Sequence, residues 1–306
     1  MEGRGVVKMR AFVFVGVAVC CALGGYGAED HADRIIAQVL SNVAKIKAVD
    51  AQAVPMAFWD FDGTIIKGDI SEGVEYVGGK YNKLYKGLVE LTIEAGLNSV
   101  YPPKGGWEQY WEKDYLYLRD RIGRWLAWPF NAQMYHGQSA TALDAFCEAA
   151  CENLYRKWYF TSSMKILRAL EKAGVENYVV SASPEIFVRN TAKTLGIPKE
   201  RCRGIRVEID GDYVTTKVIY PIPNGEGKVE DVRAFVLGRP HGVAVAAFGN
   251  SYSTDGAFLR YVATQPSLPG GAKGTAVMIN GGKIVPGYTE HFITVDQDEV
   301  QGEKRL

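Results

Sequence analysis

The sequence predicts an α/β protein with a largely parallel sheet, helices on both faces, and an inserted helical segment. Residues 54–59 form a short apolar run that is typical of a buried parallel strand. From residue 161 onward, strand-like and helix-like stretches alternate. Between these regions, residues 67–160 carry five of the six Trp and ten of the seventeen Tyr, in a pattern that is helical where it is readable. We therefore expect a core of residues 29–66 and 161–306, with the segment 67–160 inserted into it.

The individual elements follow from apolar spacing and from turn residues. Residues 31–49 have apolar side chains at helical spacing, which predicts a helix with one buried face. Thr161 or Ser162 is a candidate N-cap for the first helix after the insertion. The pair Asp210-Gly211 between two apolar runs predicts a β-hairpin. The expected strands are 54–59, 178–180, 205–209, 213–218, 243–248 and 275–279, and the expected helices run to Gly174, from Pro184 to about Gly196, over 228–237 and over 255–262.

The N-terminus predicts a secretory signal peptide over residues 1–28. Three basic residues precede the uncharged, mostly apolar run 11–23, and small residues follow at 24–28. This order predicts export to the periplasm, with membrane contact only during export. An uncleaved anchor is the alternative, and Cys20 and Cys21 leave a lipoprotein open.

The charge balance and the cysteines limit the function classes. Lys plus Arg and Asp plus Glu both number 35, so the chain lacks the basic excess that nucleic-acid binding needs. Cys147 and Cys151 are four residues apart in a helical stretch, and we expect them to pack on one helix face. A metal pair or a strained disulfide is the alternative. The sequence does not determine the oligomeric state.

The segment Asp60-Phe61-Asp62-Gly63-Thr64 directly follows the first apolar strand. Two carboxylates at a strand end can hold a divalent cation, or one can attack phosphorus while the other moves a proton. Gly63 allows the chain to turn, so the two carboxylates need not have the same role. An Asp-Gly turn with a solvated second aspartate is the simpler alternative.

Three later positions carry polar groups at strand or helix ends. Ser181 ends the second predicted strand and can donate to a phosphate oxygen, or it can cap a helix. Lys228 follows the flexible loop 224–227, where an ammonium can offset anionic charge, although most lysines are solvated. The loop from Asn250 to Asp255 follows another strand and offers oxygen ligands for a hard cation. A polar loop before a helix is the alternative there.

These motifs, in this order, resemble the haloacid dehalogenase (HAD) superfamily over roughly residues 54–280. The aromatic segment after the first motif is similar to the helical cap of the branch that contains phosphoserine phosphatase. Within that branch the chain looks most like the phosphorylcholine phosphatases, on the grounds of the 249–255 loop, the run 181–183 and the aromatic-rich cap. The resemblance implies a Rossmann-like fold and Mg²⁺-dependent hydrolysis of a small phosphate monoester.

The resemblance also implies a role for each motif residue. Asp60 would be the nucleophile, Asp62 the general acid and base, and Lys228 the group that stabilises the phosphoryl group. The phosphate would be held by Thr64, Ser181, Ala182 and Lys228, and Mg²⁺ by Asp60, Asp62, Asn250 and Asp255. The family usually has Asp at position 250, so the uncharged Asn250 weakens the expected metal site and leaves a non-catalytic ligand-binding protein as an alternative.

The aromatic residues of the inserted segment suggest a substrate. Several aromatic faces can form a cage for a quaternary ammonium group. We therefore expect phosphocholine, or a similar small aminated phosphate, to contact Trp107, Tyr110 and Trp111. Packing of a helical bundle explains the same residues without a ligand. Phosphoserine or another small metabolite ester is the alternative substrate.

Overall fold

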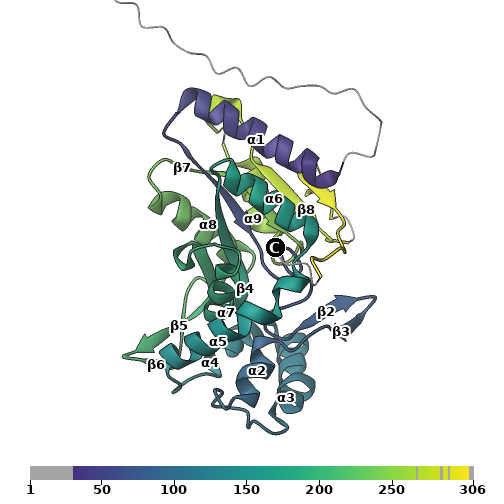
Figure 1. Ribbon diagram of the computed structural model, residues 1–306, viewed down its shortest axis with the longest axis vertical. Helices are drawn as coiled ribbons and strands as arrows, with labels where there is room; N and C mark the ends of the chain where they lie inside the picture. The colour runs from purple at the N-terminus through teal and green to yellow at the C-terminus, as the bar shows by residue number, and fades with distance from the viewer. Residues whose placement is uncertain (1–29, 267, 283–284, 289, 303–306) are drawn as a thin grey trace, which may run out of the picture.

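The computed structural model describes residues 30–266, 268–282, 285–288 and 290–302. The expected signal peptide, residues 1–28, lies outside the described residues. A seven-stranded sheet has the order β6-β5-β4-β1-β7-β8-β9, and only the β5–β6 pair is antiparallel (Figure 1). Its strands are β1 Val54–Trp59, β4 Glu176–Pro184, β5 Cys202–Asp210, β6 Tyr213–Ile219, β7 Gly242–Gly249, β8 Thr275–Ile279 and β9 Phe292–Val295.

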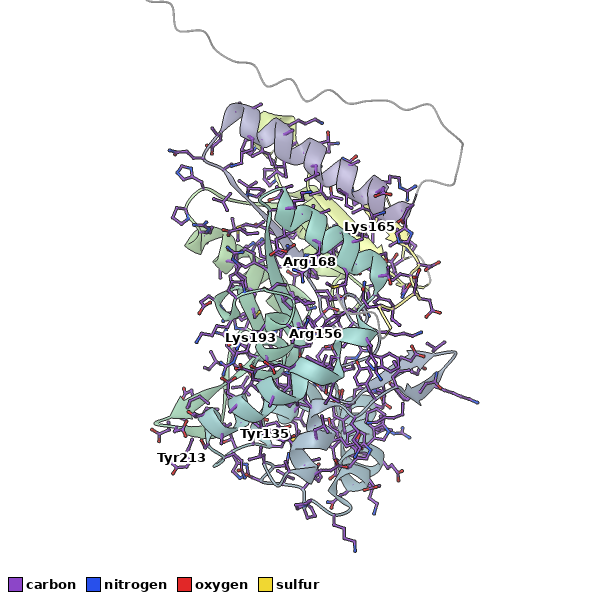
Figure 2. The ribbon with its side chains drawn as sticks, viewed as in Figure 1. Tyr135, Arg156, Lys165, Arg168, Lys193 and Tyr213 are labelled. Carbon is purple, nitrogen blue, oxygen red and sulfur yellow. The ribbon has the colours of Figure 1, made fainter. Side chains whose placement is uncertain are left out.

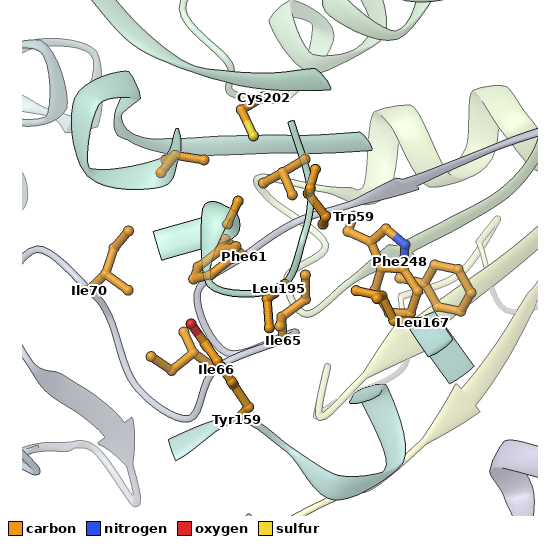
Figure 3. Close-up of a cluster of buried hydrophobic side chains, with 14 of the residues drawn as sticks. Trp59, Phe61, Ile65, Ile66, Ile70, Tyr159, Leu167, Leu195, Cys202 and Phe248 are labelled. Atoms are coloured by element: carbon orange, nitrogen blue, oxygen red, sulfur yellow. The ribbon is translucent and has the colours of Figure 1, made fainter. Parts of the chain in front are cut away.

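Helices cover both faces of this sheet, as predicted. Along β1, Ala57 and Trp59 point into one apolar cluster, while Met56 and Phe58 point into another, because successive side chains of a strand alternate in direction. The first cluster includes side chains from α1 (His31–Val49), α6 (Thr161–Lys172) and α7 (Glu185–Lys193), and the second includes side chains from α8 (Glu226–Gly238) and α9 (Gly256–Thr264). In the first cluster the Trp59 ring stacks on Phe248 with centroids 3.7 Å apart (Figure 3).

Helix α1 is held against α6 by charge as well as by apolar contact. The Lys165 Nζ lies 2.9 Å from Asp30 Oδ2 and 2.8 Å from Asp33 Oδ1 (Figure 2). The other Asp30 oxygen, Oδ1, accepts a hydrogen bond from the Ala32 backbone N–H over 3.0 Å and caps α1. The helix predicted over residues 31–49 is confirmed with the same bounds.

The insertion between β1 and α6 is mostly helical, as expected, but it also contains a β-hairpin that was not predicted. The hairpin consists of β2 (Val74–Val77) and β3 (Lys80–Lys83). In Figure 1 the insertion lies at the opposite end of the molecule from α1. Its helices are α2 Leu88–Glu94, α3 Gly106–Glu108, the π-helical η1 Gln109–Tyr115 and η2 Leu118–Ile122, α4 Arg124–Gln133, α5 Ala140–Leu154 and the 3₁₀-helical η3 Arg156–Trp158. Two further 3₁₀ turns, η4 Lys199–Arg201 and η5 Pro269–Gly271, lie in the core.

Three details correct or complete the sequence interpretation. Phe160 is the N-cap residue of α6, so the expectation that Thr161 or Ser162 caps this helix was wrong. Strand β9 was not predicted, because it is only four residues long and only two of them are buried. Cys147 and Cys151 are buried, free thiols on α5, which confirms the expectation that they pack on the helix.

Within the described residues, no helix combines the length and the apolar character that crossing a bilayer requires.

Candidate functional site

The carboxyl ends of β1, β4 and β7 meet at one edge of the sheet, beside a cavity of about 500 Å³. Parallel α/β sheets place ligands at this edge because polar loops and helix N-termini gather there. The cavity is lined by six of the predicted site residues, Asp60, Asp62, Trp111, Ala182, Lys228 and Asn250. Three others, Thr64, Ser181 and Asp255, are buried and hydrogen-bonded to residues of the lining.

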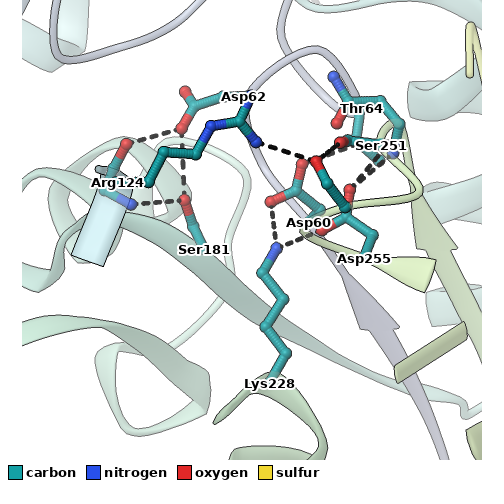
Figure 4. A network of polar contacts seen from close by, with 11 residues as sticks. Asp60, Asp62, Thr64, Arg124, Ser181, Lys228, Ser251 and Asp255 are labelled. Carbon is teal, nitrogen blue, oxygen red and sulfur yellow. Dashed lines mark hydrogen bonds and ion pairs between the residues drawn. The ribbon is translucent and has the colours of Figure 1, made fainter. Parts of the chain in front are cut away.

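Lys228 joins the two aspartates of the first and last motifs. Its Nζ lies 2.6 Å from Asp60 Oδ1 and 2.6 Å from Asp255 Oδ1 (Figure 4). The lysine side chain is fully buried in the first turns of α8. Burial lowers the pKa of Lys228, but the charges of Asp255 and Asp60 outweigh it and leave the pKa raised. The site therefore holds a fixed positive charge.

Asp60 lies at the end of β1 with both carboxylate oxygens engaged. Its Oδ1 contacts Lys228, and its Oδ2 accepts a hydrogen bond from the Thr64 hydroxyl over 3.1 Å. Its backbone N–H donates to the Phe248 carbonyl over 2.8 Å, which ties it to β7. Burial and the charge of Asp255 raise the pKa of Asp60 to about 7, against the opposing effect of Lys228. The carboxylate is therefore held in one orientation by Lys228 and Thr64.

Asp62 has different partners from Asp60, as the turn in the chain suggested. Its Oδ2 accepts hydrogen bonds from Ser183 over 2.7 Å and from Ser181 over 3.3 Å. Its Oδ1 accepts one from the Ile70 backbone N–H over 2.8 Å. Burial, followed by the charge of Asp69, raises the pKa of Asp62 to about 8. The two carboxyl groups therefore lie in the same cavity with separate hydrogen-bond sets.

Gly63 is required for the close approach of the first and last motifs. Its φ of 71° lies in the left-handed region, and a Cβ at this position would meet Asn250 Nδ2 at 1.9 Å. The Asn250 side chain therefore lies directly against the 60–64 turn. The backbone N–H groups of Asn250 and Ser251 donate to Asp255 Oδ2 over 3.0 and 2.9 Å, which fixes the loop around this aspartate.

The donor set at this edge fits Mg²⁺. Asp60, Asn250 and Asp255 bring two carboxylates and one amide oxygen to one end of the sheet, and all are hard oxygen donors. Mg²⁺ usually binds through one or two carboxylates and keeps water or substrate phosphate as its other ligands. No group of three or more His, Cys, Asp or Glu side chains within the described ranges has metal-binding geometry. These donors therefore suit a cation whose remaining ligands are water and substrate oxygens.

Several site residues were missed in the sequence. Ser183 lies two residues after Ser181, and the two-residue repeat of an extended strand was the available signal. Asp69 and Glu72 line the cavity, and burial raises the pKa of both carboxyls. Arg124 at the start of α4 reaches across to the last motif, where its Nη1 donates to Ser253 Oγ over 2.9 Å. Asp69, Glu72 and Arg124 could not be predicted, because their place at the cavity depends on how the insertion folds back over the sheet.

The three aromatic residues expected to contact substrate are not placed alike. Trp111 lines the cavity. Tyr110 is fully buried, and its hydroxyl donates to Glu72 Oε1 over 2.6 Å, behind the cavity wall. Trp107 stacks on Trp111 with centroids 5.9 Å apart and is covered by Lys83, whose Nζ lies 3.8 Å from the ring centroid. The cavity instead contains other rings of the insertion, namely Tyr76, Tyr81, Tyr115 and Trp128.

The family model of the haloacid dehalogenase-like hydrolases matches residues 57–260. This match covers more than half of the chain and spans the four motifs that form the site. The chain therefore belongs to the haloacid dehalogenase-like hydrolase family, which confirms the family and the enzyme class expected from the motifs. No curated protein sequence matches this chain significantly.

Solved structures support the fold at low sequence identity. A protein of unknown function from Anaerococcus prevotii DSM 20548 is 14% identical, with a TM-score of 0.52, over 83% of this chain and 86% of that chain. Another, from Bordetella pertussis Tohama I, is 16% identical, with a TM-score of 0.52, over 78% of this chain and 94% of that chain. These likenesses show the α/β fold.

Proposed function

We propose that the protein is a Mg²⁺-dependent phosphomonoesterase that hydrolyses a small phosphate ester through an aspartyl-phosphate intermediate. One observation carries the proposal. The Lys228 ammonium lies between Asp60 and Asp255 beside the cavity, at 2.6 Å from an oxygen of each. Phosphoryl transfer needs an oriented nucleophile and fixed positive charge more than it needs covalent chemistry from the protein.

The reaction takes two steps. A carboxylate oxygen of Asp60 forms a bond to phosphorus while the bond to the ester oxygen breaks, and Asp62 gives its proton to the departing alkoxide. Water then attacks phosphorus of the aspartyl phosphate, its proton passes to Asp62, and the Asp60–phosphorus bond breaks to release phosphate. Ser181 and Ser183 orient the Asp62 carboxyl through their hydrogen bonds. Mg²⁺ held by Asp60, Asp62, Asn250 and Asp255 would supply positive charge to the phosphoryl oxygens.

We propose phosphocholine as the substrate, because the cavity combines aromatic and acidic walls. Its lining includes Trp111, Trp128 and the carboxyls of Asp69 and Glu72. The aromatic rings already attract cations from the protein itself, since the Arg119 guanidinium lies 4.5 Å from the Tyr81 ring centroid. A quaternary ammonium group gains about 2 kcal/mol from such a ring when it is desolvated.

A second candidate substrate carries a carboxylate, as phosphoserine does. Arg119 and Arg124 both line the cavity and offer planar donors that suit a carboxylate. The Arg124 guanidinium also lies 5.4 Å from the Trp128 ring centroid, on the inserted segment. The carboxylate of such a substrate would bind the two arginines. The quaternary ammonium of phosphocholine would instead compete with the arginines for the aromatic faces.

A phosphate-release assay tests the proposal. The purified protein is given phosphocholine, phosphoserine and a sugar phosphate, with and without Mg²⁺. We expect Mg²⁺-dependent release, a preference for phosphocholine, and loss of activity in Asp60→Asn but not in the surface control Asp33→Asn. Ligand binding with no release from any ester, unchanged in Asp60→Asn, would support a non-catalytic binding protein instead. A preference for the sugar phosphate would exclude the aromatic cage.

We also propose that the protein is exported to the periplasm. The support is the order of basic, apolar and small residues over 1–28. The N-terminal sequence of the protein recovered from a periplasmic fraction is the test, and we expect it to begin near Glu29. Recovery of the intact N-terminus in the membrane fraction would favour an uncleaved anchor.

A further inference from the structure

The core and the insertion are joined by two chain segments that pair with each other. The first linker follows Asp60, and the second leads into α6. Ile66 forms an antiparallel bridge with Tyr159. The Lys67 N–H donates to the Trp158 carbonyl and the Phe160 N–H donates to the Ile65 carbonyl, each over 2.9 Å. The first linker also contains Thr64, whose hydroxyl orients Asp60.

The C-terminal segment, residues 296–302, pairs with the second of these two linkers. Val300 forms an antiparallel bridge with Phe160. The Gln301 N–H donates to the Tyr159 carbonyl over 2.8 Å, and the Thr161 N–H donates to the Glu299 carbonyl over 2.9 Å. The same segment reaches the cavity, because Asp298 is part of its lining and pairs with Lys67. The C-terminal segment therefore covers the junction between the core and the insertion.

Gln297 connects this segment to the nucleophile. Its Nε2 donates to the Thr64 carbonyl over 2.9 Å, and its Oε1 accepts a hydrogen bond from Ser162. The single hydroxyl proton of Ser163 is shared between the Thr64 carbonyl, at 2.6 Å, and Gln297 Oε1, at 3.0 Å. The Gln297 backbone is fixed in turn by two hydrogen bonds of 2.7 Å with the Asn280 side chain, after β8. A contiguous set of hydrogen bonds thus runs from β8 through Gln297 to Thr64 and Asp60.

We infer that the C-terminal segment, through Gln297, is a positioning element of the active site: it fixes Thr64, and thereby the Asp60 carboxylate, for attack. The inference rests on the proposed function for its kinetic readout. Gln297 touches no reacting atom, so we expect it to act through the orientation of Asp60 and to change kcat. Misplacing a nucleophile by a fraction of an ångström slows a reaction without weakening ground-state binding.

Three variants test the inference with full-length protein. Gln297→Met keeps the side-chain length and removes the side-chain hydrogen bonds, while the backbone bonds with Asn280 remain. Gln297→Glu keeps the acceptor for Ser162 and Ser163 but removes the donor to Thr64. Gln301→Met makes the same chemical change in the same segment, at a residue whose backbone N–H donates to the Tyr159 carbonyl. Steady-state phosphate release is measured well below the thermal unfolding midpoint of each variant.

We expect kcat to fall about 5- to 10-fold in both Gln297 variants, with KM changed less than about twofold, because one hydrogen bond is worth about 1 kcal/mol. Gln301→Met should keep wild-type kcat. Equal kcat in Gln297→Met and Gln301→Met, or a loss confined to KM, would overturn the inference. If kcat fell in Gln297→Met but not in Gln297→Glu, the hydrogen bonds with Ser162 and Ser163 would be the ones that matter. The inference that the hydrogen bond from Gln297 to the Thr64 carbonyl positions Asp60 would then be overturned.

Hydrogen exchange separates failure of this inference from failure of the proposed function. If the wild-type protein releases no phosphate from any ester, the amides of residues 63–67 and 157–161 still report on the junction. We expect their exchange to be faster in Gln297→Met than in Gln301→Met by about fivefold, from the same hydrogen bond. Unchanged exchange of these amides in Gln297→Met would overturn the inference whatever the activity.

Discussion

Lys228 and Asp60 form a buried ion pair in which Nζ lies 2.6 Å from Oδ1, although 168 residues separate them along the chain. Asp255 Oδ1 lies 2.6 Å from the same ammonium. The lysine thus compensates two carboxylates that lie next to each other within the fold. We therefore expect the lysine to stabilise the folded state and, under the proposed function, to be needed for catalysis.

Lys228→Met should therefore destabilise the protein by about 3–5 kcal/mol and abolish phosphate release, because two buried carboxylates lose their counter-charge. Denaturant unfolding and the release assay measure both effects. The double variant Lys228→Met, Asp255→Asn should recover part of the stability and none of the activity. Normal stability in Lys228→Met would show that Asp60 and Asp255 do not depend on the ammonium.

Gly63→Ala should impair both the turn and the site. Its backbone is in the left-handed region, which costs a residue with Cβ about 1–2 kcal/mol, and the new methyl group would collide with Asn250. Gly211→Ala is the matched control, since Gly211 has a φ of 61° and open space where the alanine methyl group would lie. We expect both variants to lose stability in denaturant unfolding, but only Gly63→Ala to lose activity. Equal activity in the two variants would contradict the close approach of Gly63 to Asn250.

Asn250→Asp should strengthen Mg²⁺ binding. A carboxylate replaces an uncharged amide among the oxygen donors, and donor charge is a main determinant of affinity for hard cations. We expect the Mg²⁺ concentration for half-maximal phosphate release to fall about tenfold, which corresponds to about 1.4 kcal/mol. Asn82→Asp, on the exposed β3, is the control and should leave it unchanged. A higher Mg²⁺ requirement in Asn250→Asp would remove residue 250 from the metal site.

Asp231 should make stability depend on pH. Burial raises the pKa of this carboxyl to about 7 despite the opposing charge of Arg203, whose Nε lies 3.2 Å from Asp231 Oδ1. The folded protein therefore binds more protons than the unfolded chain, so the contribution of Asp231 to stability is present below about pH 4 and is lost as pH rises through about 7. Asp231→Asn cannot ionise, and its stability relative to wild type should rise across this window. Urea unfolding at several pH values measures this, and parallel curves would contradict it.

Much of the core could be predicted because its signals are local. The apolar run of β1 and the amphipathic pattern of α1 depend on neighbouring residues alone, and both were found with their observed bounds. The N-cap of α6 was not found, because Phe160 occupies it without a side-chain cap hydrogen bond, while the Ser162 hydroxyl donates to Gln297 instead. That contact has no signal in the local sequence.

The site divides in the same way. Asp60 and Lys228 were found because they stand at the end of a strand and the start of a helix, where ligands gather in parallel sheets. Tyr110 was misjudged because spacing alone does not show which ring of a helix faces a cavity and which one hydrogen-bonds to Glu72 behind it. Glu72 and Arg119 were missed because the fold of the insertion decides their place at the cavity.

The pairing of residues 296–302 at the junction has a consequence for biosynthesis. Thr64 is made early, but one of the two side chains that donate to its carbonyl belongs to residue 297. A polypeptide released before residue 296 would contain every acidic and basic group of the catalytic motifs and still lack this support. The finished arrangement can therefore arise only after residues 296–302 have been made and have docked, so the hydrolase would mature late relative to its own synthesis.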